Sequence, residues 1–211
     1  MERKYDLNPN HPGKLFVISG PSGAGKGTIC KRLLEEADIE LSVSMTTRAP
    51  RNGEIEGVSY FFTDRETFIE KVRAGGFLEY AEVYENYYGT PKEPVIDRLR
   101  EGIDVILEID IQGAMKVKEN YPDGIFIFIL PPSMAELRKR ITGRGTETED
   151  AINLRLSKTL SEISYIDKYD YCVVNGVLEE AVSRVKSIIT AEHSRVTEDV
   201  SALIEKYEEE L

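Results

Sequence analysis

Gly20-Pro21-Ser22-Gly23-Ala24-Gly25-Lys26-Gly27-Thr28 is the stretch that decides the fold of this chain. It follows an apolar run at 15–19 and precedes a helical pattern over 26–37. A glycine-rich turn between a buried strand and a helix, with Lys near its end, is the order of a phosphate-binding loop. The glycines let backbone amides approach a polyphosphate, and the helix N-terminus and Lys26 add positive charge. The alternative is a glycine-rich turn without a ligand, and it does not account for the combination of four glycines with the Lys.

The composition is that of a soluble globular protein, with 211 residues, 41% apolar and 31% charged. The formal net charge of −11 argues against a general nucleic-acid or membrane surface, so an anionic substrate needs locally concentrated cations. Cys30 and Cys172 stand in apolar settings, and we expect buried free thiols in a reducing, cytoplasmic compartment. The sequence contains no apolar run of membrane-spanning length.

Continuous apolar strands at 15–19, 103–109, 125–130 and 171–175 alternate with helical patterns. This order predicts an α/β fold in which helices cover both faces of a central parallel sheet, a three-layer core. We assign this core to 1–43, 103–134 and 167–195. An inserted subdomain with its own mixed sheet occupies 44–102, a helical lid occupies 135–166, and an acidic helix occupies 196–211.

Local signals predict further elements in the insertion. Alternation at 41–45 and the run 58–62 indicate strands. Thr63 with Glu66, and Thr90 with Glu93, form the capping-box pattern, the second with Pro91 at the first helical position.

The insertion carries two arginines three residues apart, two tyrosines and a carboxylate: Arg48, Arg51, Tyr60, Tyr88 and Glu79. Arg makes fork-like hydrogen bonds to oxyanions and Tyr adds a neutral donor, so the first four residues suit a phosphate clamp. The alternatives are exposed loop charge for the arginines and a solvated strand residue for Glu79.

Five separate motifs extend this pattern in order along the chain: 44–62, 77–82, 86–90, 107–113 and 143–156. Together they resemble the guanylate kinases, nucleoside monophosphate kinases with a phosphate-binding loop, over about residues 14–192. The resemblance implies reversible transfer of the γ-phosphoryl group from MgATP to GMP or dGMP, giving ADP and GDP, in purine nucleotide metabolism and GMP recycling.

The resemblance also implies a role for each matching residue. The GMP site would comprise Ser44, Arg48, Arg51, Tyr60, Glu79, Tyr88, Thr90 and Asp110. The ATP site would comprise Gly20, Pro21, Ser22, Gly23, Ala24, Gly25, Lys26, Gly27 and Thr28, with Asn175 in the loop that meets adenine. The catalytic cations would be Lys26, Arg48, Arg144 and Arg155. For Arg155 the alternative is a surface ion pair with Glu149 or a neighbour.

Physical chemistry supports the choice of Glu79 as the reader of the base. Guanine offers N1–H and its 2-amino group as adjacent donors, whereas adenine would leave the carboxylate unpaired. We expect no general base, because the acceptor phosphate oxygen is already ionised near neutral pH. Catalysis then reduces to positioning two anions and neutralising charge.

The residue after Lys26 departs from the common loop, in which a Ser or Thr hydroxyl binds the metal. Gly27 stands at that position and Thr28 comes one later. We therefore predict that Mg²⁺ keeps more waters and relies on ATP oxygens, with Asp110 or Glu108 ordering its waters, while Thr28 reaches a phosphate oxygen.

Two other functions stay open at this point. One is a catalytically inactive module of this fold that binds proteins, although such modules lose the loop glycines and Lys. The other is a kinase for another phosphorylated acceptor, although Glu79, Tyr88 and Thr90 suit guanine. The protein could be a monomer or a homodimer.

Overall fold

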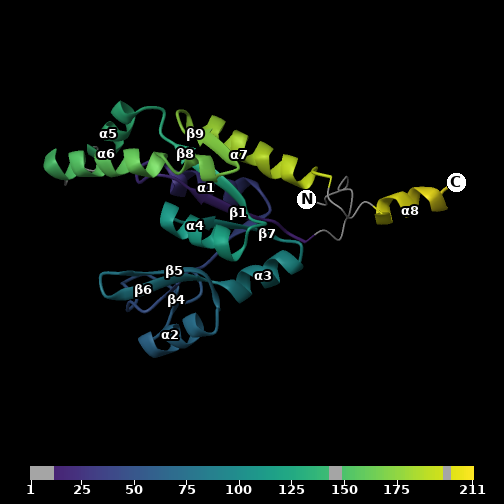
Figure 1. Cartoon of the computed structure of the whole chain (residues 1–211), viewed down its shortest axis with the longest axis horizontal. Helices are drawn as coiled ribbons and strands as arrows, with labels where there is room; N and C mark the ends of the chain where they lie inside the picture. The colour runs from purple at the N-terminus through teal and green to yellow at the C-terminus, as the bar shows by residue number, and fades with distance from the viewer. Residues whose placement is uncertain (1–11, 143–148, 197–200) are drawn as a thin grey trace.

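The computed structural model of the chain describes residues 12–142, 149–196 and 201–211. Its centre is a five-stranded sheet in the order β2-β7-β1-β8-β9, in which the paired strands are parallel (Figure 1). The strands are β1 (Leu15–Ser19), β2 (Ile39–Leu41), β7 (Asp104–Glu108), β8 (Ile125–Leu130) and β9 (Tyr171–Val174). The predicted parallel α/β core is therefore confirmed.

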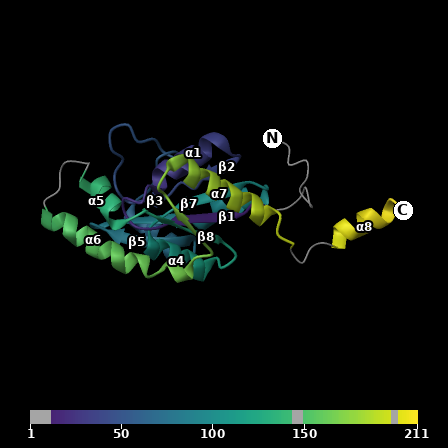
Figure 2. The same ribbon diagram turned by 90° about the horizontal axis from the view of Figure 1, so that it is seen from above.

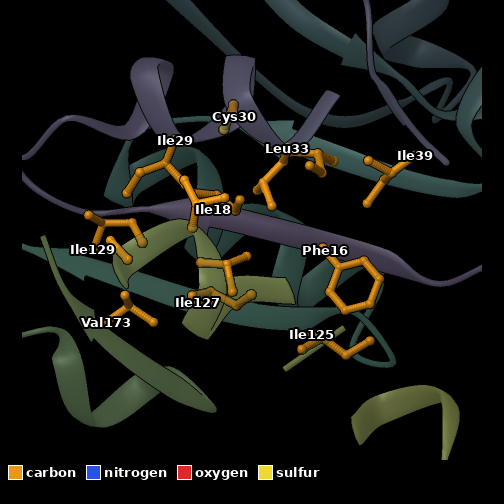
Figure 3. Packing of buried hydrophobic residues seen from close by; sticks show 14 of the residues in the cluster. Phe16, Ile18, Ile29, Cys30, Leu33, Ile39, Ile125, Ile127, Ile129 and Val173 are labelled. Atoms are coloured by element: carbon orange, nitrogen blue, oxygen red, sulfur yellow. The ribbon is translucent and has the colours of Figure 1, made fainter. Parts of the chain in front are cut away.

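Helices cover both faces of this sheet, because successive side chains of a buried strand point to opposite faces. Phe16 and Ile18 of β1 pack in one cluster with α1 (Lys26–Glu36) and α7 (Leu178–His193). Leu15 and Val17 pack in another with α3 (Lys92–Arg100) and α4 (Ile111–Asn120). Figure 2 shows α1 and α7 on one side of the sheet and α4 on the other, and Figure 3 shows the first cluster. The result is the expected three-layer core.

A second, mixed sheet is inserted between β2 and β7 and lies below the core in Figure 1. Its order is β4-β3-β6-β5, and helix α2 covers it on one side. The elements are β3 (Met45–Thr46), β4 (Phe61–Phe62), α2 (Arg65–Arg73), β5 (Phe77–Val83) and β6 (Asn86–Pro91). Phe68 of α2 is fully buried and stacks on Phe77 and Tyr87, which fastens the helix to the sheet. The inserted mixed sheet is as predicted, and the exact domain boundaries stay a prediction.

Two helices, α5 (Met134–Thr142) and α6 (Glu149–Ile163), occupy the predicted lid and pack through Leu137, Ile141 and Ile152. A short 3-10 turn, Ile166–Lys168, leads from α6 into β9. The acidic terminal segment is helical over α8 (Ser201–Glu209), and α8 lies apart from the core in both views (Figures 1 and 2).

Two strands of the insertion are shorter than the alternation pattern predicts. The run 41–45 is divided, because β2 ends at Leu41 and β3 begins at Met45, where the chain passes from the core sheet to the mixed sheet. The run 58–62 keeps only Phe61 and Phe62 as a strand, since a turn precedes it in which the Gly57 amide donates to the Tyr60 carbonyl.

Both capping boxes are wrong by one residue. Helix α2 is capped by Asp64, whose carboxylate accepts from the Thr67 amide at 2.8 Å. Pro91 is the residue that caps α3 and not its first helical residue, and it caps without a side-chain hydrogen bond. Thr90 is instead part of the site described below.

The cysteines differ from each other. Cys30 is buried, and burial raises the pKa of its thiol to about 12, so it is protonated at neutral pH. Cys172 is exposed on β9, the edge strand of the core sheet, so the prediction of a buried thiol is wrong there. Among the described helices, none is long and apolar enough to cross a membrane.

Candidate functional site

The phosphate-binding loop joins β1 to α1 at the carboxyl edge of the parallel strands, where this class of sheet binds ligands. Gly25 is the residue before the helix and has φ of +92°, a left-handed conformation that favours glycine. A Cβ at Gly25 would also lie 2.3 Å from the side-chain nitrogen of Asn175. Both backbone geometry and space therefore require glycine at this point.

Asn175, which directly follows β9, stabilises the loop through a side-chain hydrogen bond. Its side-chain amide is buried and donates to the Ala24 carbonyl at 2.8 Å. Arg140 of α5 in turn donates to the Asn175 backbone carbonyl at 2.9 Å. A structural role for the Asn175 side chain is thus clear, and its predicted contact with adenine stays a prediction.

Lys26 points back into the loop. Its Nζ donates to the carbonyls of Gly20 at 2.7 Å and Pro21 at 3.2 Å. Desolvation lowers the pKa of the ammonium, and the nearby carboxylates of Glu108, Glu162 and Asp110 act against this shift. Two backbone carbonyls of the loop therefore hold the ammonium, and a phosphate could replace them as its acceptors.

Gly27 lies against the carboxylate of Glu108. A Cβ at Gly27 would lie 3.2 Å from Glu108 Oε1, closer than an ordinary contact. In the common motif this position carries a Ser or Thr hydroxyl. Here the oxygen atoms beside it belong to Glu108, from the neighbouring strand β7. Desolvation raises the pKa of the Glu108 carboxyl, and the charge of Lys26 opposes that shift.

The loop opens into a cavity of about 660 Å³. Its walls come from the loop, from the end of β7, from α5 and from the segment after β9: Ser22, Gly23, Gly25, Lys26, Gly27, Thr28, Glu108, Arg140, Asn175, Gly176 and Leu178. Backbone amides, two cations and one carboxylate therefore face one space large enough for a nucleotide.

A second cavity of about 210 Å³ lies between the mixed sheet and the start of α4. It brings together five of the predicted acceptor residues, Ser44, Tyr60, Glu79, Tyr88 and Asp110. The rings of Tyr60 and Tyr88 meet edge to face at 6.1 Å. Asp110 caps α4 by accepting from the Gly113 amide at 2.8 Å.

Glu79 of β5 is the central carboxylate of this second cavity. Thr90 Oγ1, fully buried on β6, donates to Glu79 Oε1 at 2.7 Å. Desolvation raises the Glu79 pKa, the Thr90 hydrogen bond lowers it, and the charge of Asp110 raises it further. This is a half-buried carboxylate and not a solvated strand residue.

Arg48 does not line this cavity, but it contacts Tyr60, which does, and it is oriented by Glu54. One nitrogen of Arg48 donates to both Glu54 oxygens, at 2.8 and 3.0 Å, and the guanidinium lies over the Tyr60 ring at 5.5 Å. The Arg51 amide also donates to Glu54 at 2.7 Å. The Arg51 side chain itself is exposed, and it is not among the residues that line the cavity.

Of the two arginines predicted to act from the lid, Arg155 lies among the described residues. Arg155 of α6 donates to Ser22 Oγ of the phosphate loop at 2.8 Å, so the lid already reaches the loop. Glu149 forms an ion pair with Arg138. Arg144, the other predicted lid arginine, lies outside the described residues.

A family model for guanylate kinase matches residues 12–192. The chain belongs to the guanylate kinase family. It is 60% identical over 184 residues to a guanylate kinase of Clostridium acetobutylicum, covering 87% of this chain and 88% of that protein. It is 52% identical over 200 residues to one from Clostridioides difficile, covering 94% and 98%. A crystal structure of guanylate kinase from Anaplasma phagocytophilum aligns with a TM-score of 0.68 at 39% identity, covering 89% of each chain.

Two residues of the site were not identified from the sequence alone. Glu54 lies inside the motif at 44–62, but only the structure shows that it pairs with Arg48. Arg140 lines the loop cavity from α5, and the cluster of basic residues at 138–140 is its only sequence signal.

The role of the Arg48–Glu54 pair can be tested by mutation. Glu54→Gln should raise the KM for GMP by roughly tenfold with a smaller change in kcat, because Arg48 loses the partner that orients it. Steady-state kinetics with varied GMP measures this. Glu35→Gln, which breaks an exposed Arg32–Glu35 pair on α1, is the matched control and should leave KM unchanged. An unchanged KM in Glu54→Gln would mean that the pair serves the fold alone.

Proposed function

We propose that this chain catalyses the reversible transfer of the ATP γ-phosphoryl group to GMP or dGMP, giving ADP and GDP. The observation that carries the proposal is Glu79, a half-buried carboxylate with a Thr90 hydrogen bond in a cavity that also contains two tyrosines. This cavity belongs to a different sheet from the phosphate loop, as a two-nucleotide site requires. Relatives named guanylate kinase, 52% to 60% identical over most of the chain, support the same activity.

The donor half binds the ATP phosphates. Amides of the loop and the Lys26 ammonium would neutralise the β- and γ-phosphates, as in other loops of this type. The exposed hydroxyl of Thr28 is available to a phosphate oxygen. Asn175 keeps the Ala24 carbonyl turned away from the phosphates, because that carbonyl accepts its amide.

The acceptor half binds GMP. Glu79 would accept from guanine N1–H and the 2-amino group, with Ser44, Thr90 and Asp110 assisting. Arg48, Arg51, Tyr60 and Tyr88 would hold the phosphate. The contacts of Arg48 with Glu54 and with the Tyr60 ring support this role for Arg48. Arg51 would have to turn inward on binding.

Phosphoryl transfer needs no general base, because the attacking phosphate oxygen is already anionic. Transition-state charge would be met by Lys26 and Arg48 and by arginines of the lid, Arg155 and Arg144. The contact between Arg155 and Ser22 supports a lid that closes on the loop. Closure would also exclude water, which otherwise accepts the phosphoryl group.

Mg²⁺ is the cofactor we infer, carried with ATP. The Glu108 carboxylate lines the loop cavity beside Gly27, and Asp110 follows on the same segment. Carboxylate oxygens suit Mg²⁺, and the ion usually keeps several waters, so these two residues would hold it through water. When bound, the ion would neutralise charge on the transferred group.

A coupled assay of ADP release with GMP, dGMP, AMP, UMP and ribose phosphates tests the proposed function. We expect turnover with GMP at least about 10³-fold above AMP. Absence of turnover with GMP would overturn the proposal, and would favour the inactive protein-binding module. Faster turnover with another acceptor would favour the alternative kinase. The intact loop glycines and Lys26 count against the inactive module.

The binding partners, the compartment and the oligomeric state stay predictions. We infer ATP and GMP as the partners, no nucleic acid, no membrane, a cytoplasmic compartment and a monomer or homodimer. The net charge of −11 supports the absence of a general nucleic-acid surface.

A further inference from the structure

The seam between the core and the inserted sheet is formed by α4 and β5. Two side chains of α4, one helical turn apart, reach across it to backbone carbonyls of β5. Lys116 Nζ donates to the Tyr80 carbonyl at 2.5 Å, and Asn120 Nδ2 donates to the Leu78 carbonyl at 2.8 Å. The core helix therefore holds the two residues on either side of Glu79.

These contacts matter because β5 is an edge strand, in the order β4-β3-β6-β5. Its register with β6 pairs Glu79 with Thr90, Tyr80 with Gly89 and Ala81 with Tyr88. The carbonyls of Leu78 and Tyr80 accept from side chains of α4, so the strand has contacts on that side as well. The Glu79 segment is thus fixed from both sides, by β6 and by α4.

Lys116 differs from Asn120 in two ways. It is charged, and it lines the second cavity, between the mixed sheet and the start of α4, which we call the acceptor cavity. It lines that cavity together with Glu79, and its ammonium lies 5.4 Å from the centre of the Tyr80 ring. The start of α4 is also close to Glu79, since a Cβ at Gly113 would lie 3.4 Å from Glu79 Oε2.

The charged and titratable groups around Glu79 come from three sources. Besides desolvation, Asp110 at the start of α4 raises the Glu79 pKa, whereas Lys116 lowers it. Tyr88 of β6 and Tyr60, which precedes β4, complete the lining. Among these groups in the described cavity, Lys116 is the cation that favours the charged carboxylate.

We propose that Lys116 is a positioning residue for guanine recognition. Through Tyr80 it fixes the strand segment that carries Glu79, and its charge favours the ionised carboxylate that accepts from guanine. The proposal rests on the proposed role of Glu79.

The experiment measures GMP affinity by titration calorimetry from about pH 5 to about pH 8. The variants are Lys116→Gln, which keeps a donor without the charge, Lys116→Arg, which keeps the charge, and Asn120→Ala, which removes the neighbouring neutral contact. The phosphate of GMP titrates identically in every case, so differences between variants belong to the protein.

We expect Lys116→Gln to weaken GMP binding about three- to tenfold at neutral pH and to move the loss of affinity to higher pH. Lys116→Arg should restore both the affinity and the pH profile. Asn120→Ala should lower thermal stability and leave the pH profile in place. A Lys116→Gln profile that superimposes on the wild type would overturn the proposal.

Glu79→Gln in the same assay distinguishes a failure of the role of Lys116 from a failure of the role of Glu79. If Glu79→Gln changes the pH profile and Lys116→Gln does not, only the role of Lys116 fails. If Glu79→Gln leaves the GMP affinity and its pH profile unchanged, the proposed role of Glu79 fails first.

Discussion

Lys26→Ala lowers kcat by about 10³-fold or more while the fold survives. Lys26 supplies the full positive charge of the phosphate loop, and removal of one donor aimed at a transition state costs about that much. The fold should survive because the ammonium contacts only backbone carbonyls of the loop, at Gly20 and Pro21, among the described hydrogen bonds. Water in the open cavity can solvate these carbonyls.

Two measurements accompany this variant. Single-turnover transfer from ATP to GMP gives the chemical step, and thermal unfolding monitors the fold. Lys31→Ala is the matched control, because it removes the same charge from an exposed position on the same helix. Equal kcat values for the two variants would remove Lys26 from the catalytic assignment.

Glu79→Gln should lower kcat/KM for GMP by about 10²-fold or more and leave AMP turnover unchanged or higher. The Gln oxygen can still accept from Thr90, which now donates to Glu79 Oε1. The Gln amide then places a donor opposite the two donors of guanine. The GMP/AMP ratio therefore falls, and competition kinetics with both nucleotides measures it.

Glu82→Gln is the control for Glu79→Gln. It makes the same isosteric change on the same strand, at an exposed residue that pairs with Arg65. We expect its GMP/AMP ratio to equal that of the wild type. An unchanged ratio in Glu79→Gln would show that the carboxylate does not read the base.

The raised pKa of Glu79 also predicts how GMP affinity and folding stability depend on pH. In the proposed role the ionised form of Glu79 reads guanine, so we expect GMP affinity to be present above this pKa and to be lost as pH falls through it. Because the pKa is raised, this loss begins at higher pH than for an ordinary Glu. The sign for stability is opposite, since protonation relieves a desolvated charge and favours the folded state. Ligand-free Glu79→Gln should therefore unfold at a higher temperature at neutral pH than the wild type.

The phosphate loop, the parallel core and the inserted acceptor subdomain were predictable from the sequence. Each depends on local chemistry: glycines before a Lys at a helix start, apolar runs of strand length, and an arginine- and tyrosine-rich segment between core strands. The residues of the acceptor cavity followed from the family resemblance, and the structure brings five of the eight into one cavity.

Tertiary structure alone decided which side chains act on which. Thr90 has the spacing of a helix cap and bonds Glu79 instead, because strand pairing between β5 and β6 places the two opposite each other. Asn175 holds the loop from 151 residues away in sequence. Glu54 holds Arg48, and Lys116 holds the strand of Glu79.

Gly27, in the loop at 20–28, shows both what the sequence determined and what the tertiary structure decided. The composition of 20–28 determined a phosphate-binding loop and marked Gly27 as the departure from the common motif. That a carboxylate fills the space beside Gly27 depends on β7 lying next to β1 with Glu108 opposite Ile18. Because β1 and β7 are far apart in the sequence, the residue that lies opposite Ile18 is decided only when the sheet forms.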